Sequence, residues 1–426
     1  MKSKLRTLAA LGALAVVLCG SSAFAAGNPE RGDVISISKS ASLAGKIDAL
    51  DLDLLGDWNG RIYVLAGPDD LEKLEREQVA YFPESGRLGR PTGPAAFQTG
   101  SGPNGAYHSY LELEADLFSL QRQYPDIARV FDLGETFERR HIYALKISDH
   151  VEREESEAEV LFLGCHHARE WISVEVPFLL GKYLVENYAT DPDVQRLVNN
   201  SEIWIIPLVN PDGLEYTIHS FRYWRKNRRD LGKGNFGVDL NRNYSFKWGA
   251  DNEGSSYNPA SDIYRGSVPF SEPETRAVRD LFLKKDFQAV ISYHSFSQTI
   301  LYPWGYTRVP SDKDAELRDM AVRMAARIQA VNGRVYQFGE SGQSLYLTNG
   351  DATDWTFGIS GIPSFTIELP PIDELYGGFF NREEDIVPVF EENLPAMIYL
   401  IDRSIQNFRP LTASPFDLRT LFFNKD

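Results

Sequence analysis

Apolar runs and helical patterns alternate along the chain from Tyr107 onward. Four apolar runs are typical of buried strands: AEVLFLG (158–164), EIWIIPL (202–208), FQAVISY (287–293) and PSFTIEL (363–369). Helical patterns lie between them, at 172–188, 271–285 and 314–331. The second of these begins with Ser271-x-x-Glu274 and Pro273, a pattern typical of a capping box. Strands that alternate with helices predict an α/β domain with a mixed central sheet flanked by helices.

The start of the chain has the pattern of an export signal. A basic start precedes an apolar run at 8–18, and AFA (23–25) supplies the motif after which a signal peptidase cuts. We therefore predict a signal peptide over 1–25 and a secreted product, extracellular or periplasmic. The apolar run is too short for a permanent span, so we expect no stable membrane anchor. Cys19 leaves a lipoprotein as the alternative, but Leu18 stands where a lipobox has a small residue.

The pattern of residues 26–90 predicts a small, separate α+β domain. RIYVLA (61–66) is typical of a strand, 68–78 of a helix with an acidic first turn, and VAYF (79–82) of a second strand. The segment 91–105 that follows is dense in proline and glycine, which is typical of an exposed linker.

Composition limits the partners and the source of stability. A net charge of −16 argues against nucleic acid or an anionic membrane as a partner. Once the signal peptide is removed, Cys165 is the last of the two cysteines, so the mature chain has no intramolecular disulfide. Stability must then come from burial of the core, which the aromatic content of 12% makes plausible. We expect a monomer.

Three of the predicted strands end directly on titratable residues. The first runs into His166, His167 and Glu170. The second ends on His294 and the third on Glu368. In an open α/β sheet, ligands bind beyond the carboxyl ends of the strands. Because three separate strands carry such residues at this end, we expect one shared functional site.

The spacing of these residues favours a catalytic zinc site. Such a site takes three nitrogen or oxygen ligands and leaves one position open for water. His167 and Glu170 are three residues apart, so both side chains face the same way on one helical turn. His294 is the best-placed third ligand, whereas His166 lacks the H-x-x-E spacing and Cys165 is more typical of a buried filler. H-x-x-E is common by chance, so the prediction of one Zn²⁺ per chain depends on the convergence of the strands.

Seven motifs extend this pattern along the chain: HAREWIS (167–173), NPDG (210–213), WRKNR (224–228), GVDLNRNY (237–244), SYHSFSQ (292–298), YLTNGDATDW (346–355) and FTIEL (365–369). In this order they resemble the zinc metallocarboxypeptidases of the carboxypeptidase A/B type. The resemblance implies that family's fold, with a catalytic domain at 106–405, and leaves a C-terminal extension at 406–426 without a role. It also implies zinc-dependent hydrolysis of the C-terminal peptide bond of peptides and proteins.

The same resemblance implies roles for individual residues. It makes His167, Glu170 and His294 the zinc ligands, Glu368 the general base and Arg225 the residue that stabilises the oxyanion. It implies four substrate-binding residues: Asn241 and Arg242 for the terminal carboxylate, Tyr346 as a mobile cover over it, and Arg169 in an auxiliary subsite. A planar guanidinium suits a carboxylate, and this clamp distinguishes an exopeptidase from an endopeptidase.

Substrate preference follows from two further positions. In the family, the residue matched by Thr353 is aliphatic in enzymes that prefer apolar C-terminal residues. It is aspartate in those that prefer lysine or arginine. Here it is threonine, and an acid occurs at Asp351 instead. We therefore expect mixed apolar and basic specificity, with Asp351 providing the basic preference.

The resemblance also bears on regulation and on the alternatives. Residues 26–90 resemble propeptides that block the cleft, so the chain's own propeptide is the expected inhibitor, with Arg87 and Arg90 as activation points. A permanently attached accessory domain is the alternative. For function, the alternatives are a cell-wall stem-peptide carboxypeptidase and a non-catalytic peptide-binding homologue. Retention of both predicted histidine ligands, Glu170 and Glu368 argues against the latter.

Overall fold

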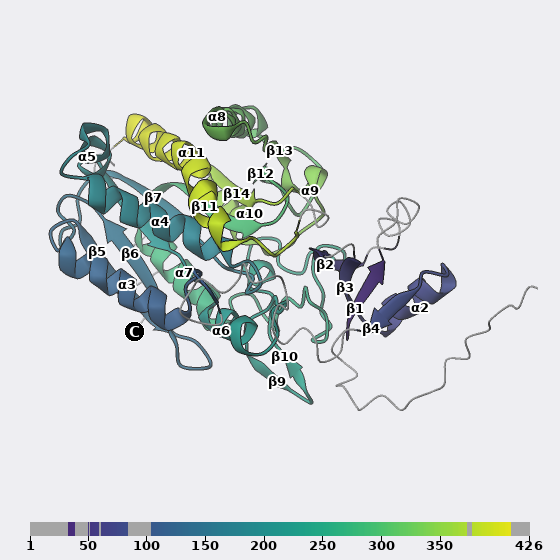
Figure 1. Cartoon of the computed structure of the whole chain (residues 1–426). Helices are drawn as coiled ribbons and strands as arrows, with labels where there is room; N and C mark the ends of the chain where they lie inside the picture. The colour runs from purple at the N-terminus through teal and green to yellow at the C-terminus, as the bar shows by residue number, and fades with distance from the viewer. Residues whose placement is uncertain are drawn as a thin grey trace, which may run out of the picture.

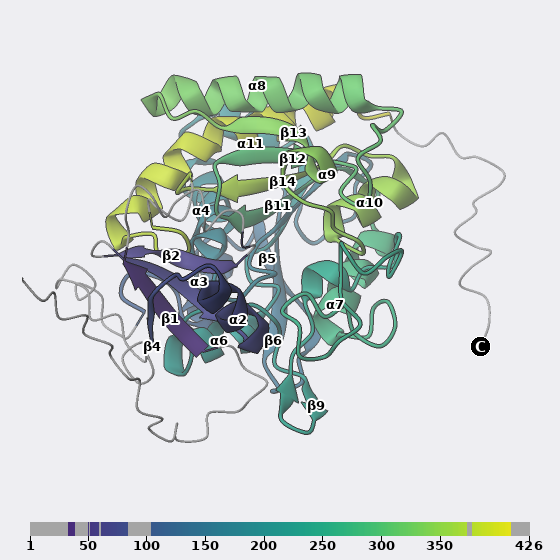
Figure 2. The same ribbon diagram turned by 90° about the vertical axis from the view of Figure 1, so that its right-hand side faces the viewer.

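The computed structural model describes residues 33–38, 50, 52–58, 61–83, 104–372 and 377–409 of the chain. The predicted signal peptide, the proposed activation points Arg87 and Arg90, most of the predicted linker and nearly all of the C-terminal extension lie outside the described residues. Within the described ranges, no helix is both long and apolar enough to cross a membrane. Figures 1 and 2 show a large domain with a smaller unit beside it.

An eight-stranded mixed sheet forms the centre of the large domain. In spatial order its strands are β13 (Gln337–Glu340), β12 (Thr299–Tyr302), β14 (Ser364–Leu369), β11 (Phe287–Ser295), β7 (Ala158–Leu163), β8 (Ser201–Ile206), β6 (His141–Ile147) and β5 (Ala128–Glu135). The four central strands, from β14 to β8, are parallel to one another. By contrast, β12 runs antiparallel to β14, and β6 runs antiparallel to β8 and β5. The predicted mixed sheet is confirmed, and the four central strands are the four predicted apolar runs.

Helices cover both faces of this sheet. One face carries α3 (Tyr110–Gln123), α4 (Ile172–Asn187), α5 (Pro192–Val198), α8 (Asp314–Asn332) and α11 (Ile386–Asn407). The other face carries α7 (Pro273–Lys284) and α10 (Ala352–Ser360). Alternate residues of β7 divide between the two cores, since Val160 and Phe162 pack with the first group and Leu161 and Leu163 with the second. Figure 2 shows α4 on one side of the sheet, with α7 and α10 on the other.

Shorter elements complete the large domain. They are α6 (Pro211–His219), the hairpin of β9 (Asp230–Gly232) and β10 (Asn235–Phe236), α9 (Ser341–Ser344), and the 3-10 turns η3 (Leu240–Arg242) and η5 (Glu383–Asp385). Several of them follow strands of the central sheet in the chain, so they shape the loops around the site.

The predicted capping box of α7 is wrong. The helix begins at Pro273 with Glu272 as its N-cap, and no side chain caps it. The Ser271 hydroxyl instead donates to the Glu272 carboxylate at 2.6 Å. The buried Glu274 carboxylate accepts from Asn227 Nδ2 at 3.1 and 3.2 Å. Glu274, which the sequence pattern assigns to the cap of α7, is therefore bonded to Asn227 from another part of the chain.

The smaller unit has its own sheet and core. Its antiparallel strands lie in the order β2 (Asp53–Trp58), β3 (Arg61–Ala66), β1 (Asp33–Ser38) and β4 (Tyr81–Pro83), with helix α2 (Pro68–Arg76) after β3. Ile35, Ile62, Val64 and Leu74 belong to a buried cluster separate from the two clusters of the large domain.

Candidate active site

The ends of three neighbouring strands position the site. Strand β7 ends just before Gly164, where a Cβ atom would collide with the backbone oxygens of Ser173 and Pro207. Glycine therefore lets the chain turn directly under the next helix and present His167. On the adjacent strands, His294 of β11 and Glu368 of β14 are register partners. The two side chains thus come from directly opposed positions of parallel strands.

His167, Glu170 and His294 form a buried group with converging donor atoms. Potential ligand atoms of all three lie within 4.8 Å of one another. The Glu170 carboxylate lies 2.8 Å from His167 Nδ1 and 3.0 Å from His294 Nδ1. His167 and Glu170 lie in a turn before α4 rather than in the predicted helical turn, closed by the bond from Glu170 N to His167 O at 3.2 Å. This turn still points both side chains the same way.

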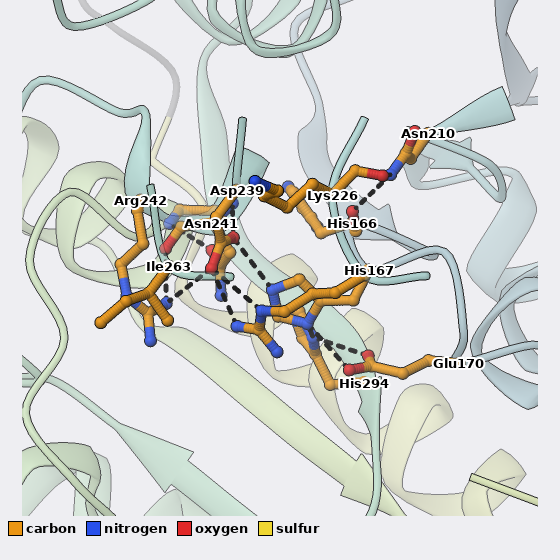
Figure 3. A network of polar contacts seen from close by, with 12 residues as sticks. His166, His167, Glu170, Asn210, Lys226, Asp239, Asn241, Arg242, Ile263 and His294 are labelled. Atoms are coloured by element: carbon orange, nitrogen blue, oxygen red, sulfur yellow. Dashed lines mark hydrogen bonds and ion pairs between the residues drawn. The ribbon is translucent and has the colours of Figure 1, made fainter. Parts of the chain in front are cut away.

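The outward nitrogens of both histidines already have partners. His167 Nε2 lies 3.2 Å from Asp239 Oδ1, and His294 Nε2 lies 3.1 Å from Ser292 Oγ. The Nδ1 atoms therefore remain to face Glu170, and the donor set of two imidazoles and one carboxylate fits a zinc ion. Figure 3 shows His167 and Glu170 meeting His294, with Asp239 on the side of His167 away from Glu170.

Asp239 connects the histidine ligand to an arginine. Arg225 Nε and Nη2 donate to Asp239 Oδ2 at 3.1 and 3.0 Å. Burial opposes ionisation of Asp239, but Arg225 and His167 more than offset it and hold its pKa well below the usual range. Asp239 is thus a buried anion that fixes both the His167 ring and the Arg225 guanidinium.

Glu368 lies in a different electrostatic environment. Its side chain is buried, and burial raises its pKa to about 8, with the Glu170 charge acting in the same direction and His294 and Arg225 opposing it. A carboxyl with such a pKa both accepts and releases a proton near neutral pH.

One pocket contains most of the predicted substrate-binding residues. Its lining includes His167, His294 and Glu368 together with the following predicted substrate residues: Asn241, Arg242, Tyr346, Asp351 and Thr353. Arg242 is buried, and its Nε and Nη1 donate to the carbonyls of Gly254 and Asn241 at 2.7 and 2.8 Å. Asn241 Oδ1 in turn accepts from the amide of Ala352 at 3.0 Å. These bonds fix the orientation of both side chains at the pocket.

The acidic end of the pocket is built around the start of α10. Asp351 is the N-cap of this helix, with Oδ1 accepting from Asp354 N at 2.8 Å and Oδ2 from Thr348 Oγ1 at 2.7 Å. Burial raises the pKa of Asp351, and these hydrogen bonds oppose the rise. The hydroxyl of Thr353 pairs with that of Thr366 at 2.7 Å, so this hydroxyl already has a partner within the protein.

Arg169 and Arg225 lie apart from this lining. The guanidinium carbon of Arg169 lies 4.1 Å from the ring centre of Phe379, and its carbonyl accepts from Arg222 at 2.7 Å. Arg225 shares the Asp239 carboxylate with His167, and its charge also acts on the Glu368 carboxyl of the pocket. The structure therefore brings the three predicted ligands, Glu368 and the five pocket residues together, and the two arginines are not among the residues that line the pocket.

Sequence reasoning did not find three residues that contact the site. Asp239 occurs in the motif GVDLNRNY, where an acid between two apolar residues was the available signal. Ser292 and Tyr244 offered no comparable signal, because their contacts are made only in the folded chain.

Buried metal-type ligands, a carboxyl with a raised pKa beside them and a fixed arginine at the pocket are the groups of a metal-dependent hydrolase. The family profile described as zinc carboxypeptidase matches residues 113–396. Carboxypeptidase B of Astacus astacus is 37% identical over 293 residues, which cover 67% of this chain and 93% of that protein. Carboxypeptidase A4 of Mus musculus is 35% identical over 290 residues, which cover 68% of each chain.

Among solved structures, the crystal structure of thrombin activatable fibrinolysis inhibitor (TAFI) matches with a TM-score of 0.71 and 27% identity. The match covers 88% of this chain and 99% of that one. The chain therefore belongs to the zinc carboxypeptidase family, a family of peptide hydrolases whose cofactor is zinc. The family and the enzyme class expected from the sequence are confirmed.

Proposed function

We propose that the protein is a secreted carboxypeptidase that hydrolyses the last peptide bond of peptides and proteins, with one zinc ion per chain. One observation carries this proposal. The ligands His167 and His294, the carboxyl of Glu368 and the guanidinium of Arg242 line a single pocket. A carbonyl-activating centre and a carboxylate anchor in one pocket suit cleavage next to a free C-terminus.

The chain supplies the proton transfers and the charge stabilisation. Zinc bound to His167, Glu170 and His294 would polarise the scissile carbonyl and acidify a nearby water. Glu368 takes a proton from the attacking water and passes it to the leaving amine, because its carboxyl lies in the same pocket as His167 and His294. Arg225, held by its two bonds to Asp239, stabilises the negative charge that develops on the carbonyl oxygen.

Asn241 and Arg242 select a free C-terminus. Arg242 offers a planar cation whose orientation is fixed by two carbonyls, so little rotamer entropy remains to be lost when it binds a carboxylate. The ring centre of Tyr346 lies 5.9 Å from this guanidinium, and the residue is 48% exposed. We assign it to close over the bound carboxylate.

The pocket favours mixed specificity. Asp351 is a buried acid in the lining and would pair with the cation of a C-terminal lysine or arginine. Leu301 and Leu345 offer apolar side chains in the same lining. An apolar C-terminal side chain would contact that surface.

Secretion and zymogen control also belong to this proposal. The signal-peptide pattern at 1–25 supports export. The smaller unit has its own sheet and precedes the catalytic domain, as an inhibitory propeptide would. The match to TAFI covers more of this chain than the predicted catalytic domain does, which supports a shared N-terminal unit.

One assay tests the activity and separates the alternatives. The processed, zinc-loaded enzyme is given free-acid peptides, their C-terminal amides and a cell-wall stem peptide, and release of the last residue is measured with and without a chelator. We expect zinc-dependent cleavage of the acids and little of the amides. Equal cleavage of both would contradict the carboxylate clamp. Preference for the stem peptide would indicate the cell-wall alternative, and zinc binding without turnover a peptide-binding homologue.

A further inference from the structure

His166 is a fully buried histidine beside the metal site, but it does not belong to the converging ligand group. Its Nε2 lies 2.8 Å from the Tyr244 hydroxyl, and its Nδ1 lies 3.3 Å from Ser292 Oγ. Ser292 Oγ in turn lies 3.1 Å from Nε2 of His294. All four residues are at most 1% exposed. A continuous, buried chain of polar groups thus leads from a predicted zinc ligand into the core.

This chain has one self-consistent arrangement of protons once the metal is bound. His294 presents Nδ1 to the ligand group, so its Nε2 carries the hydrogen and donates to Ser292 Oγ. The Ser292 hydroxyl then donates to His166 Nδ1. His166 therefore carries its hydrogen on Nε2 and donates to the Tyr244 oxygen. Every bond in the chain points away from the metal.

We propose that His166 is a positioning residue, which acts through Ser292 to hold the ring of His294 and increase its strength as a zinc donor. The proposal rests on the zinc site of the proposed function. Hydrogen bonds aligned in one direction polarise one another, so electron density shifts toward His294 Nδ1. Because the partners are neutral, this support adds no charge to a site that already contains the carboxylates of Glu170 and Asp239.

The two histidine ligands are thus supported in different ways. His167 is oriented by a buried anion, Asp239, whose charge is balanced by Arg225. His294 is oriented by the hydroxyl–imidazole–phenol chain. The competing explanation is that His166 only fills space, since its ring lies parallel to that of His294 at 5.6 Å and 14°. Phenylalanine would fill the same space without either hydrogen bond, and this separates the two explanations.

The test is a double-mutant cycle on zinc affinity, measured by chelator competition on the full chain. The variants are His166→Phe, Ser292→Ala and the double variant. Loss of an outer partner of a metal ligand lowers affinity by about 10- to 100-fold, so each single variant should fall in this range. The double variant should bind no more weakly than the weaker single one, because Ser292→Ala already interrupts the chain. The proposal would be overturned if the double variant lost zinc affinity by the product of the two single losses. It would also be overturned if either single variant bound zinc as tightly as the wild type.

Two further measurements keep the test decisive. His166→Asn, whose amide oxygen replaces Nδ1 as an acceptor, should recover part of the affinity, and a space-filling role predicts no such recovery. If His166→Phe does not fold, Tyr244→Phe combined with Ser292→Ala provides the same cycle with the same two outcomes. Failure of the proposed function is recognised separately, because the wild-type chain would then not bind zinc or not release C-terminal residues.

Discussion

The carboxyl of Glu368 lies opposite His294 in the sheet, and burial raises its pKa to about 8. Glu368→Gln keeps the size of the side chain and removes the proton acceptor. We expect kcat/KM for C-terminal release to fall by about 10²- to 10⁴-fold with zinc content unchanged, because Glu368 is not one of the ligands. Glu316→Gln, on the exposed surface of α8, is the matched control. Near-normal activity in Glu368→Gln would exclude this residue as the general base.

Asp351 combines a structural role with the proposed specificity role. Asn also caps helices well, so Asp351→Asn should keep α10 in place while removing the charge. A hydrogen bond to a charged group contributes about 1.5–3 kcal/mol, so the ratio of basic to apolar cleavage should fall by about 10- to 100-fold. The ratio is measured as kcat/KM for matched peptides ending in arginine and leucine. An unchanged ratio would show that another group recognises the basic side chain.

The sequence predicted the residues of the site better than it predicted their contacts. His167, Glu170, His294 and Glu368 could be found because each follows or ends a recognisable apolar run. His166 could only be excluded as a ligand. Its partners are 78 and 126 residues away in the chain, and a pairing at that separation is decided by the packing of strands rather than by local pattern.

At the scale of elements, the segment before α3 is fastened to α4 by one histidine. His108 Nδ1 lies 2.7 Å from Glu175 Oε2, and its amide donates to Oε1 of the same carboxylate at 2.8 Å. Burial lowers the pKa of His108, but Glu175 and then Asp116, 3.2 Å from Nε2, more than offset this and raise it to about 9. The protonated form is thus favoured in the folded chain. This stabilisation is fully present below the unfolded pKa of about 6.5 and is lost as the pH rises through 9.

His108→Asn therefore changes the pH dependence of stability. Between pH 6 and pH 10 the wild-type chain should lose on the order of 3 kcal/mol of unfolding free energy that the variant does not lose. Urea titrations of zinc-loaded protein at the two pH values measure this difference. His219→Gln, on the exposed end of α6, controls for loss of a histidine. The same pH slope in His108→Asn and wild type would show that the Glu175 contact does not carry the effect.

The hydrophobic pattern predicted the four central strands of the sheet but not the short strands β12 and β13 or helix α11. β7, β8, β11 and β14 are buried on both faces, so each appears in the sequence as a mostly apolar run. β12 and β13 have only four residues each, too few for a pattern to emerge. α11 has Pro395 in its interior, which argues against a helix until packing outweighs local propensity.

For the whole molecule, the described residues divide into two units with separate sheets and separate buried clusters. No strand of the small sheet pairs with the eight-stranded sheet within the described ranges. Cleavage between the units would therefore leave the hydrogen bonds of both sheets intact. The predicted linker at 91–105 provides a place for such cleavage, and it follows Arg87 and Arg90 directly.

An inhibitory propeptide predicts that cleavage increases activity. The purified full chain should hydrolyse a small free-acid peptide slowly, and limited trypsin treatment should raise the rate, because release of the small unit would open the pocket that contains Glu368 and Arg242. The N-terminus of the activated enzyme should then lie after Arg87 or Arg90. In the Arg87→Gln, Arg90→Gln double variant the same treatment should leave the rate low. A full chain as active before cleavage as after it would instead identify residues 26–90 as an accessory domain, since a bound inhibitor must lower the rate for every substrate that enters the pocket.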